Sequence, residues 1–159
     1  MPISSSARTR LEFQHRTIRE LIGDHSEEVL KRRPDPEKWS VFENIAHMAC
    51  YQPVFLHRLE TIRKEESPAF GRYKAETDPE FPAYLQRSLQ SLFEDMTDKR
   101  AALYHALTGM SEDRLLRTGT HPRFGPMTVI QWTEFFLLHE AHHIYTIFML
   151  VRQTPGVFR

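Results

Sequence analysis

Histidines near the C-terminal end of the chain are the residues with the clearest capacity for chemistry. Within the segment LLHEAHHIYTIFML, the run from His139 to His143 matches H-E-x-x-H, the helical zinc-binding motif of many metallopeptidases. Because residues four apart lie on one face of a helix, His139 and His143 could fill two positions of a tetrahedral zinc site. His142 lies about 60° from His139 on the other side, so we expect the ligand pair to be His139 and His143.

A peptidase site would need a third ligand, and the large families with this motif supply it downstream. After His143 the sequence reads IYTIFMLVRQTPGVFR, which contains no His, Asp, Glu or Cys. We therefore expect any third ligand to come from the residues before His139. This pattern argues against a peptidase and leaves a metal site open.

His47 is the upstream histidine best placed to be that third ligand. It lies about two turns into a predicted helix, in WSVFENIAHM, where apolar neighbours favour an inward direction. His57 falls about 280° further round the same helix and is expected at the surface. The remaining upstream histidines are weaker candidates, as core or boundary residues or as loop and helix-end residues: His15, His25, His105 and His121.

Two acidic residues lie close in sequence to the predicted ligands. Glu43 is four residues before His47 and could orient its ring, although a helix-capping role explains Glu43 equally well. Glu140 follows His139 but points about 100° away, so a general-base role depends on geometry that spacing does not give. The candidates for orienting the ligands or lining the pocket are therefore Glu43, Glu140, His142 and His15.

Helical periodicity organises most of the chain, and no segment alternates for long enough to predict a strand. The first helical pattern runs from Leu11 to the Pro-rich break at 33–36, and the second runs from a capping box at Ser40 to about Lys64. The third spans roughly 83–107, and the fourth begins at a capping box at Thr128 and ends before Pro155. Residues 67–82 read as a long connection and 119–126 as a loop. These patterns predict one all-α domain over residues 1–159, a four-helix bundle with a long connection between helices 2 and 3.

The composition argues against some classes of binding partner, nucleic acid in particular. The 159 residues include 21 Lys and Arg and 21 Asp and Glu, a net charge of +0, whereas nucleic-acid binding needs a local excess of positive charge. The single cysteine cannot form an internal disulfide, and neither a secretion signal nor a long apolar span is evident. We therefore expect a cytoplasmic protein that binds a small molecule, with neither nucleic acid nor membrane as a partner.

Three features in this order resemble the DinB/YfiT-like superfamily. A Trp-Ser helix start at Trp39 is followed by His47, the segment HPRFGPMTVIQW leads into the last helix, and that helix carries H-x-x-x-H. The resemblance covers residues 11 to about 153. It implies a four-helix bundle that binds one divalent metal ion, zinc or nickel, through His47, His139 and His143. It also implies a homodimer.

The resemblance further implies an activity. Members of known function are mostly bacillithiol and mycothiol S-transferases or the mycothiol-dependent maleylpyruvate isomerase, and others are described as metal-dependent hydrolases. An S-transferase-like reaction with a low-molecular-weight thiol is therefore expected first, and metal-dependent hydrolysis is the alternative. Arg72, Tyr73 and Arg123 could bind a polar cosubstrate at the pocket mouth, although surface solvation is the simpler explanation for these loop residues.

Two other classes of function fit parts of the sequence. A di-iron carboxylate bundle needs E-x-x-H on two helices, and Glu12-x-x-His15 and Glu140-x-x-His143 both match, although not on the usual pair of helices. A non-catalytic interaction or dimerisation module would use the aromatic-rich last helix as an interface. Binding of a single divalent metal ion with an exchangeable water would favour the mononuclear metal site over both the di-iron bundle and the non-catalytic module.

Overall fold

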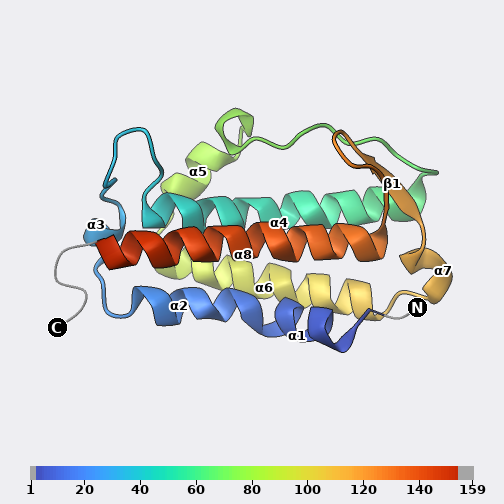
Figure 1. The fold of residues 1–159 in the computed structure, drawn as a ribbon, viewed down its shortest axis with the longest axis horizontal. Helices are drawn as coiled ribbons and strands as arrows, with labels where there is room; N and C mark the ends of the chain where they lie inside the picture. The colour runs from blue at the N-terminus through green and yellow to red at the C-terminus, as the bar shows by residue number, and fades with distance from the viewer. Residues whose placement is uncertain (1–2, 154–159) are drawn as a thin grey trace.

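The computed structural model describes residues 3–153, and its four long helical segments pack as a bundle (Figure 1). The N-terminal segment comprises α1 (Ser5–Phe13), the 3₁₀ helix η1 (Gln14–Arg16) and α2 (Thr17–Ile22). The other three are α4 (Val41–Lys64), α6 (Leu89–Thr108) and α8 (Val129–Gln153). The shorter helices are α3 (Glu27–Leu30), η2 (Ala75–Thr77), α5 (Phe81–Leu85) and α7 (Glu112–Leu115). The predicted four-helix bundle is therefore confirmed.

Both predicted capping boxes are present at the starts of the helices that carry the candidate ligands. At α4, the Ser40 Oγ accepts from the Glu43 N–H at 3.1 Å, and the Ser40 N–H donates to Glu43 Oε2 at 2.7 Å. At α8, the Thr128 N–H donates to Gln131 Oε1 at 2.9 Å, and the Gln131 N–H donates to Thr128 Oγ1 at 3.2 Å. These reciprocal bonds satisfy N–H groups that the helix cannot pair internally, so they fix where each helix begins.

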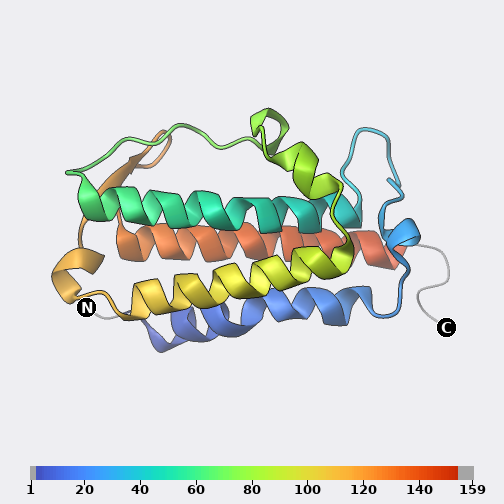
Figure 2. The same cartoon turned by 180° about the vertical axis from the view of Figure 1, so that it is seen from behind.

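The long connection decides the direction of the third helix. Residues 65–88 return along the outside of α4, so α4 and α6 run in the same direction and α8 runs opposite to both (Figures 1 and 2). The third helix begins at Leu89 and not near residue 83, because the Ser88 Oγ caps it by accepting from the Ser91 N–H at 3.2 Å. The residues before it form the separate helix α5.

The N-terminal helix is interrupted, contrary to the single helix expected up to residue 33. The chain tightens into η1 at Gln14–Arg16, and α2 ends at Gly23, which adopts a positive φ of 50°. A side chain at Gly23 would be strained in that conformation, so the glycine sets the end of the helix. Val29 then lies in the separate turn α3, where Leu30 is the buried residue.

The loop expected at 119–126 is an antiparallel hairpin of β1 (Thr118–His121) and β2 (Gly125–Thr128). Its four-residue strands are too short for alternation to predict, and packing on the bundle stabilises the pair. The Trp132 Nε1–H donates to the Gly119 carbonyl at 3.1 Å. A Cβ at Gly119 would lie 2.7 Å from the Phe70 ring, so the close contact requires glycine. The hairpin is thereby held against α8 and the long connection.

A polar layer divides the core into two apolar clusters. On α4, cluster residues up to Cys50 belong to one and those from Tyr51 onward to the other; on α6, Arg100 lies between them. All four helical segments contribute buried or partly buried polar side chains near this boundary: Gln14 and His15, His47 and Gln52, Arg100, and His139, Glu140 and His143. Because buried polar groups are costly unless paired, this layer is where a functional site is most expected.

The outer face of α8 remains apolar. Leu138 and Tyr145 are each 62% exposed, and Phe148 and Met149 are also exposed. By contrast, Trp132 and Phe136 are buried in the bundle, so only part of the aromatic content of α8 is available as an interface. Over the described residues, no helix is long and apolar enough to cross a membrane.

Candidate metal centre and adjoining pocket

His47, His139 and His143 converge from two helices. His139 Nε2 lies 3.2 Å from His47 Nε2 and 3.2 Å from His143 Nε2. One potential ligand atom from each of the three residues falls within 4.8 Å of the others, and this is the one group with ligand spacing in the part of the chain that the structure describes. The spacing of four residues on α8 brings two of the rings together, and the contact between α4 and α8 supplies the third.

The second nitrogen of one ring has a partner that orients it. His143 Nδ1 lies 2.8 Å from Asn44 Oδ1, and Asn44 is held in turn by its Nδ2–H bond to the Ser40 carbonyl at 2.8 Å. Because an amide oxygen only accepts, His143 must carry its proton on Nδ1. Its Nε2 then carries an unprotonated lone pair and lies 3.2 Å from His139 Nε2.

The three imidazoles are neutral at physiological pH. Burial lowers the pKa of His47 to about 3 and that of His139 to about 4. Burial likewise lowers the pKa of His143 to about 2, and the adjacent histidines lower it further. Since only the neutral ring offers a lone pair to a metal ion, the cluster needs no deprotonation before binding.

The spacing suits a small divalent ion. Two nitrogens bound to a tetrahedral zinc ion at the usual bond length lie about 3.4 Å apart, close to the two distances of 3.2 Å. The His47 Nδ1 is buried without a partner, so this ring is held by ring contacts with Trp39, Tyr51 and Tyr73. Three neutral nitrogen donors with a fourth position free match a catalytic more than a structural zinc site.

Glu43 does not contact His47. Its carboxylate accepts from the Ser40 N–H and forms an ion pair with Arg33, which lowers the pKa of Glu43 even though partial burial acts in the opposite direction. The capping interpretation of Glu43 is therefore correct, and the role of orienting the ring is wrong. Asn44, the next residue, makes the contact to a ligand instead, on His143.

Glu140 points away from the three histidines into the bundle. It is 2% exposed and forms a buried ion pair with Arg100, also 2% exposed. Gln14 Nε2 donates to Glu140 Oε1 at 2.9 Å and Gln52 Nε2 to Oε2 at 3.5 Å. Because both oxygens of Glu140 accept from these side chains, Glu140 is not placed to act as a general base. The carboxylate therefore links helices, whereas its neighbour His139 belongs to the histidine cluster.

The remaining candidates lie outside the cluster. His142 is exposed, although its ring is 5.4 Å from that of His143. His15 is buried, and it lines a separate cavity beside Arg100 with both ring nitrogens unpaired. Glu12 is exposed and Glu140 is paired with Arg100, so the carboxylate cluster of a di-iron bundle does not form among residues 3–153.

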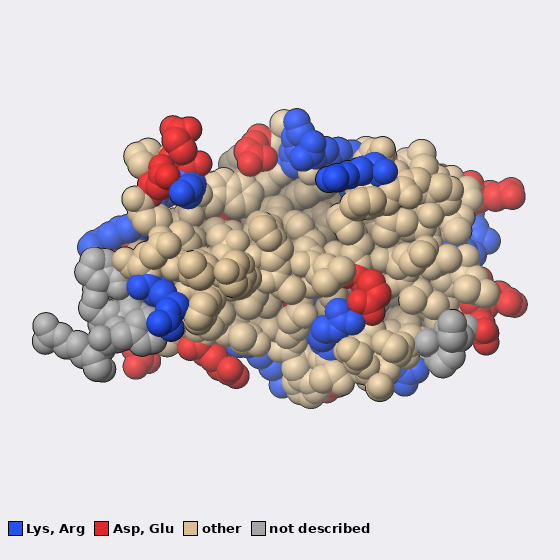
Figure 3. Space-filling view, in the orientation of Figure 1, with Lys and Arg blue, Asp and Glu red and all other residues tan. Residues whose placement is uncertain are grey.

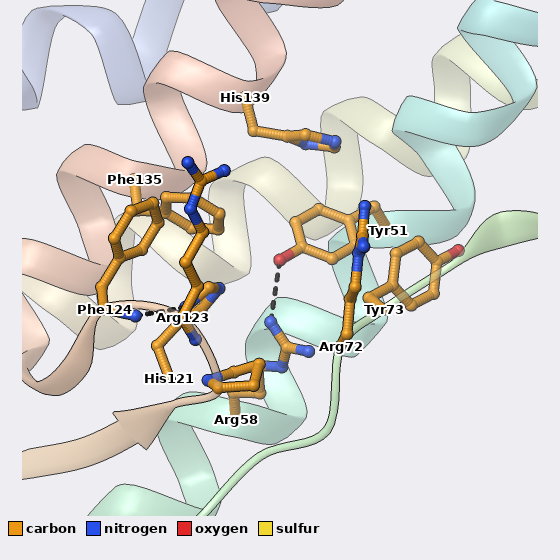
Figure 4. A pocket seen from close by; sticks show the side chains of 10 residues that line it. Tyr51, Arg58, Arg72, Tyr73, His121, Arg123, Phe124, Phe135 and His139 are labelled. Atoms are coloured by element: carbon orange, nitrogen blue, oxygen red, sulfur yellow. Dashed lines mark hydrogen bonds between the residues drawn. The ribbon is translucent and has the colours of Figure 1, made fainter.

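A cavity of about 510 Å³ opens directly beside His139. We call it the arginine pocket, defined by Tyr51, Arg58, Arg72, Tyr73, His121, Pro122, Arg123, Phe124, Phe135 and His139 (Figure 4). The long connection contributes one wall and the hairpin the opposite wall, so segments on either side of α6 in the sequence meet around one cavity. The three loop residues that sequence analysis named for the pocket mouth, Arg72, Tyr73 and Arg123, all line it.

Sequence reasoning missed or undervalued several of these residues. His121 is a pocket residue because the hairpin holds it there, and its Nδ1 accepts from the Arg123 and Phe124 N–H groups at 3.1 and 3.2 Å. Arg58 lies one position from the exposed His57 yet is buried, where it donates to the Tyr51 hydroxyl at 3.0 Å. For His121 the sequence signal was the density of Arg, His and aromatic residues in a segment expected as a loop; Arg58 lies within helix α4 and had no such signal.

Known proteins resemble this chain in sequence and in fold. The family model described as the DinB superfamily matches residues 10–147. The uncharacterised protein YuaE of Bacillus subtilis (strain 168) is 27% identical over 145 residues, which is 84% of this chain and 89% of YuaE.

Two solved structures share the bundle. YfiT from Bacillus subtilis, described as a probable metal-dependent hydrolase with an unusual four-helix bundle topology, superposes with a TM-score of 0.81 at 17% identity, over 93% of this chain and 85% of YfiT. The four-helix bundle protein TT2238 superposes with a TM-score of 0.64 at 20% identity, over 89% of this chain and 95% of TT2238. At these identities the two structures establish the fold, and the family match over most of the sequence establishes the relationship: the chain belongs to the DinB superfamily.

Proposed function

We propose that this protein is a mononuclear metal-dependent enzyme whose ion is held by His47, His139 and His143. The observation that carries the proposal is the convergence of three neutral imidazoles, with two nitrogen–nitrogen distances of 3.2 Å, on the wall of a cavity large enough for a small molecule. Zinc or nickel is the proposed ion. When bound, such an ion supplies Lewis-acid chemistry and stabilises a deprotonated nucleophile at neutral pH.

We propose transfer of a low-molecular-weight thiol as the reaction. The ten residues that line the arginine pocket include no Asp or Glu, so no carboxylate is placed there as the general base that hydrolysis favours. Positive side chains in the pocket would favour a thiolate over the neutral thiol. In the transfer, the thiol sulfur forms a bond to an electrophilic carbon, the leaving group departs with its bonding electrons, and the thiol proton passes to solvent.

Hydrolysis is the second candidate, and the description of YfiT as a probable metal-dependent hydrolase supports it. The same ligand set serves both reactions because each needs one free metal position. Assays of purified protein with monochlorobimane and a panel of thiols, and with a chromogenic ester, separate the two. Thiol-dependent conjugation without ester cleavage supports transfer, and the reverse supports hydrolysis.

Metal content tests the shared premise. Protein purified without an affinity tag should contain about one equivalent of divalent metal, measured by inductively coupled plasma mass spectrometry. His47→Ala and His139→Ala should both lose it. His57→Ala and His142→Ala are matched controls, because they remove exposed histidines from the same two helices and should retain the metal. Metal in His47→Ala, or loss in the controls, would contradict the assignment.

A further inference from the structure

The arginine pocket concentrates positive charge without a carboxylate to balance it. Arg58, Arg72, Arg123 and His121 line the cavity together with aromatic side chains, and none of its lining residues is acidic. In the space-filling view, Lys and Arg side chains border the hollow above α8 (Figure 3). The whole chain has a net charge of +0, so this local excess is a feature of the pocket and not of the composition.

Arg58 is the most informative of these residues because it is buried. It is 7% exposed, and it donates to the Tyr51 hydroxyl at 3.0 Å and to the Gly71 carbonyl at 3.1 Å. Its guanidinium lies 5.2 Å from the Trp132 ring. Within residues 3–153 it forms no ion pair with a carboxylate, although buried arginines usually have one. A bound anion would supply the missing counter-charge.

Arg72 and Arg123 lie at the mouth of the arginine pocket, where their guanidinium N–H groups are available as hydrogen-bond donors. Both are exposed, and within the described part of the chain neither guanidinium has a hydrogen-bond or ion-pair partner; the Arg123 guanidinium lies 5.6 Å from the Phe124 ring. They extend toward His139 from opposite walls of the pocket (Figure 4). A guanidinium presents a planar fork of donors that matches a carboxylate or phosphate, so two such groups form an anion clamp.

His121 adds a neutral donor. Its Nδ1 accepts two backbone N–H groups, so the proton of the neutral ring resides on Nε2, which is free to donate to an acceptor. The pKa of His121 is lowered by burial and by Arg58 and Arg123, which keeps the ring neutral at physiological pH. Its ring is centred 4.7 Å from that of Phe124 and 5.1 Å from that of Phe135, and this aromatic wall suits an apolar ligand body.

We infer that the substrate or cosubstrate in the arginine pocket is a small organic anion with an apolar or aromatic body. Its carboxylate or phosphate is bound between Arg72 and Arg123, and its body lies against Phe124 and Phe135. This assignment rests on the proposed function in one respect: a ligand held in this pocket lies beside His139, one of the proposed metal ligands. The arginines therefore determine which small molecule is positioned for reaction.

Binding of simple probes tests the assignment. Isothermal titration calorimetry at low ionic strength would compare benzoate, phenyl phosphate and the uncharged benzyl alcohol, using metal-loaded protein and protein stripped by a chelator. The benzoate or phenyl phosphate Kd should be at least about tenfold lower than that of benzyl alcohol, and Arg72→Gln or Arg123→Gln should each weaken anion binding by about tenfold. Whichever anion binds more tightly identifies the acid group.

Lys74→Gln provides a matched control, since it removes one exposed positive charge from the same connection outside the pocket lining. It should change the Kd by less than about twofold. Equal losses in Lys74→Gln and Arg72→Gln, equal binding of benzoate and benzyl alcohol, or no saturable anion binding would overturn the assignment. So would anion binding that is abolished by the chelator and unchanged in the arginine variants. Benzoate binding through the arginines in a protein that takes up no metal at His47, His139 and His143 would contradict the proposed function alone.

Discussion

Two adjacent residues of α8, Glu140 and His139, point about 100° apart around the helix, and their surroundings differ in kind. Glu140 is buried with Arg100, and its oxygens accept from Arg100, Gln14 and Gln52. His139 lies among two other imidazoles whose Nε2 atoms are directed at one another, beside an open cavity. The first set is paired mainly within the protein, although Arg100 Nε and Gln52 Oε1 are buried without a hydrogen-bond partner. The second converges at the cavity wall, where the proposed function places a metal ion.

The different partners of Glu140 and His139 distinguish the polar residues of the central layer that are structural from those that are available for chemistry. A buried carboxylate whose oxygens accept from side chains of three other helical segments holds those segments in register and is not available to a ligand. Neutral rings with free lone pairs at a cavity wall have the opposite character. The H-E-x-x-H pattern thus divides into two functions, because its glutamate belongs to the first set and its histidines to the second.

The largest effect expected from this comparison is on stability. Glu140→Ala should lower the free energy of unfolding by about 3–5 kcal/mol, because Arg100 would remain buried without its counter-charge. Urea denaturation followed by circular dichroism measures the change. Glu134→Ala, which removes the partly exposed partner of Arg10, should cost less than about 1 kcal/mol. Similar losses in the two variants would show that the buried pair has no special structural role.

Metal binding to the three histidines should stabilise the folded protein. At a free zinc concentration about a hundred times Kd, the wild type should gain about 2.7 kcal/mol, seen as a higher melting temperature. His139→Ala should gain nothing from zinc, while His142→Ala should behave as the wild type because that residue is exposed. Zinc stabilisation that persists in His139→Ala would place the ion elsewhere.

A smaller effect should follow from the residue that orients His143. Asn44→Ala removes the partner of His143 Nδ1 and should weaken zinc binding by about 10–100-fold. Competition with a chromophoric chelator measures the affinity. Ser40→Ala disturbs the same end of α4 without touching a ligand, so it should cost about 1 kcal/mol of stability and leave zinc affinity close to the wild-type value. Equal zinc affinities in the two variants would contradict the orienting role.

The most gradual effect concerns pH. Burial lowers the pKa of His15 from 6.5 to about 4. Below about pH 6.5 the unfolded chain therefore takes up a proton that the folded chain does not, and the contribution of His15 to stability is lost as the pH falls toward about 4, by up to about 1.4 kcal/mol per pH unit. In zinc-saturated protein, the free energy of unfolding should decrease less between about pH 7 and about pH 5 in His15→Leu than in the wild type. Urea denaturation at each pH measures it. Parallel profiles for the two proteins would exclude this contribution.

Much of the architecture followed from local patterns. Apolar spacing at helical period and the two capping boxes predicted α4 and α8 closely, since these signals act between residues three or four apart. The break within the N-terminal helix and the start of the third helix at Leu89 were not predicted. Both depend on hydrogen bonds within single turns and on tertiary packing. Apolar periodicity is assessed over many residues and does not detect either. The hairpin was missed because its strands are only four residues long.

The sequence by itself determined the pair His139 and His143, because one turn of a helix fixes their relation, and it favoured His47 through an apolar neighbourhood and a family resemblance. Only the tertiary structure decided that Asn44 and not Glu43 contacts a ligand, that Glu140 turns toward Arg100, and that the long connection and the hairpin enclose the arginine pocket. These contacts join residues far apart in the chain. Their formation depends on how whole helices and loops pack, which no local spacing encodes.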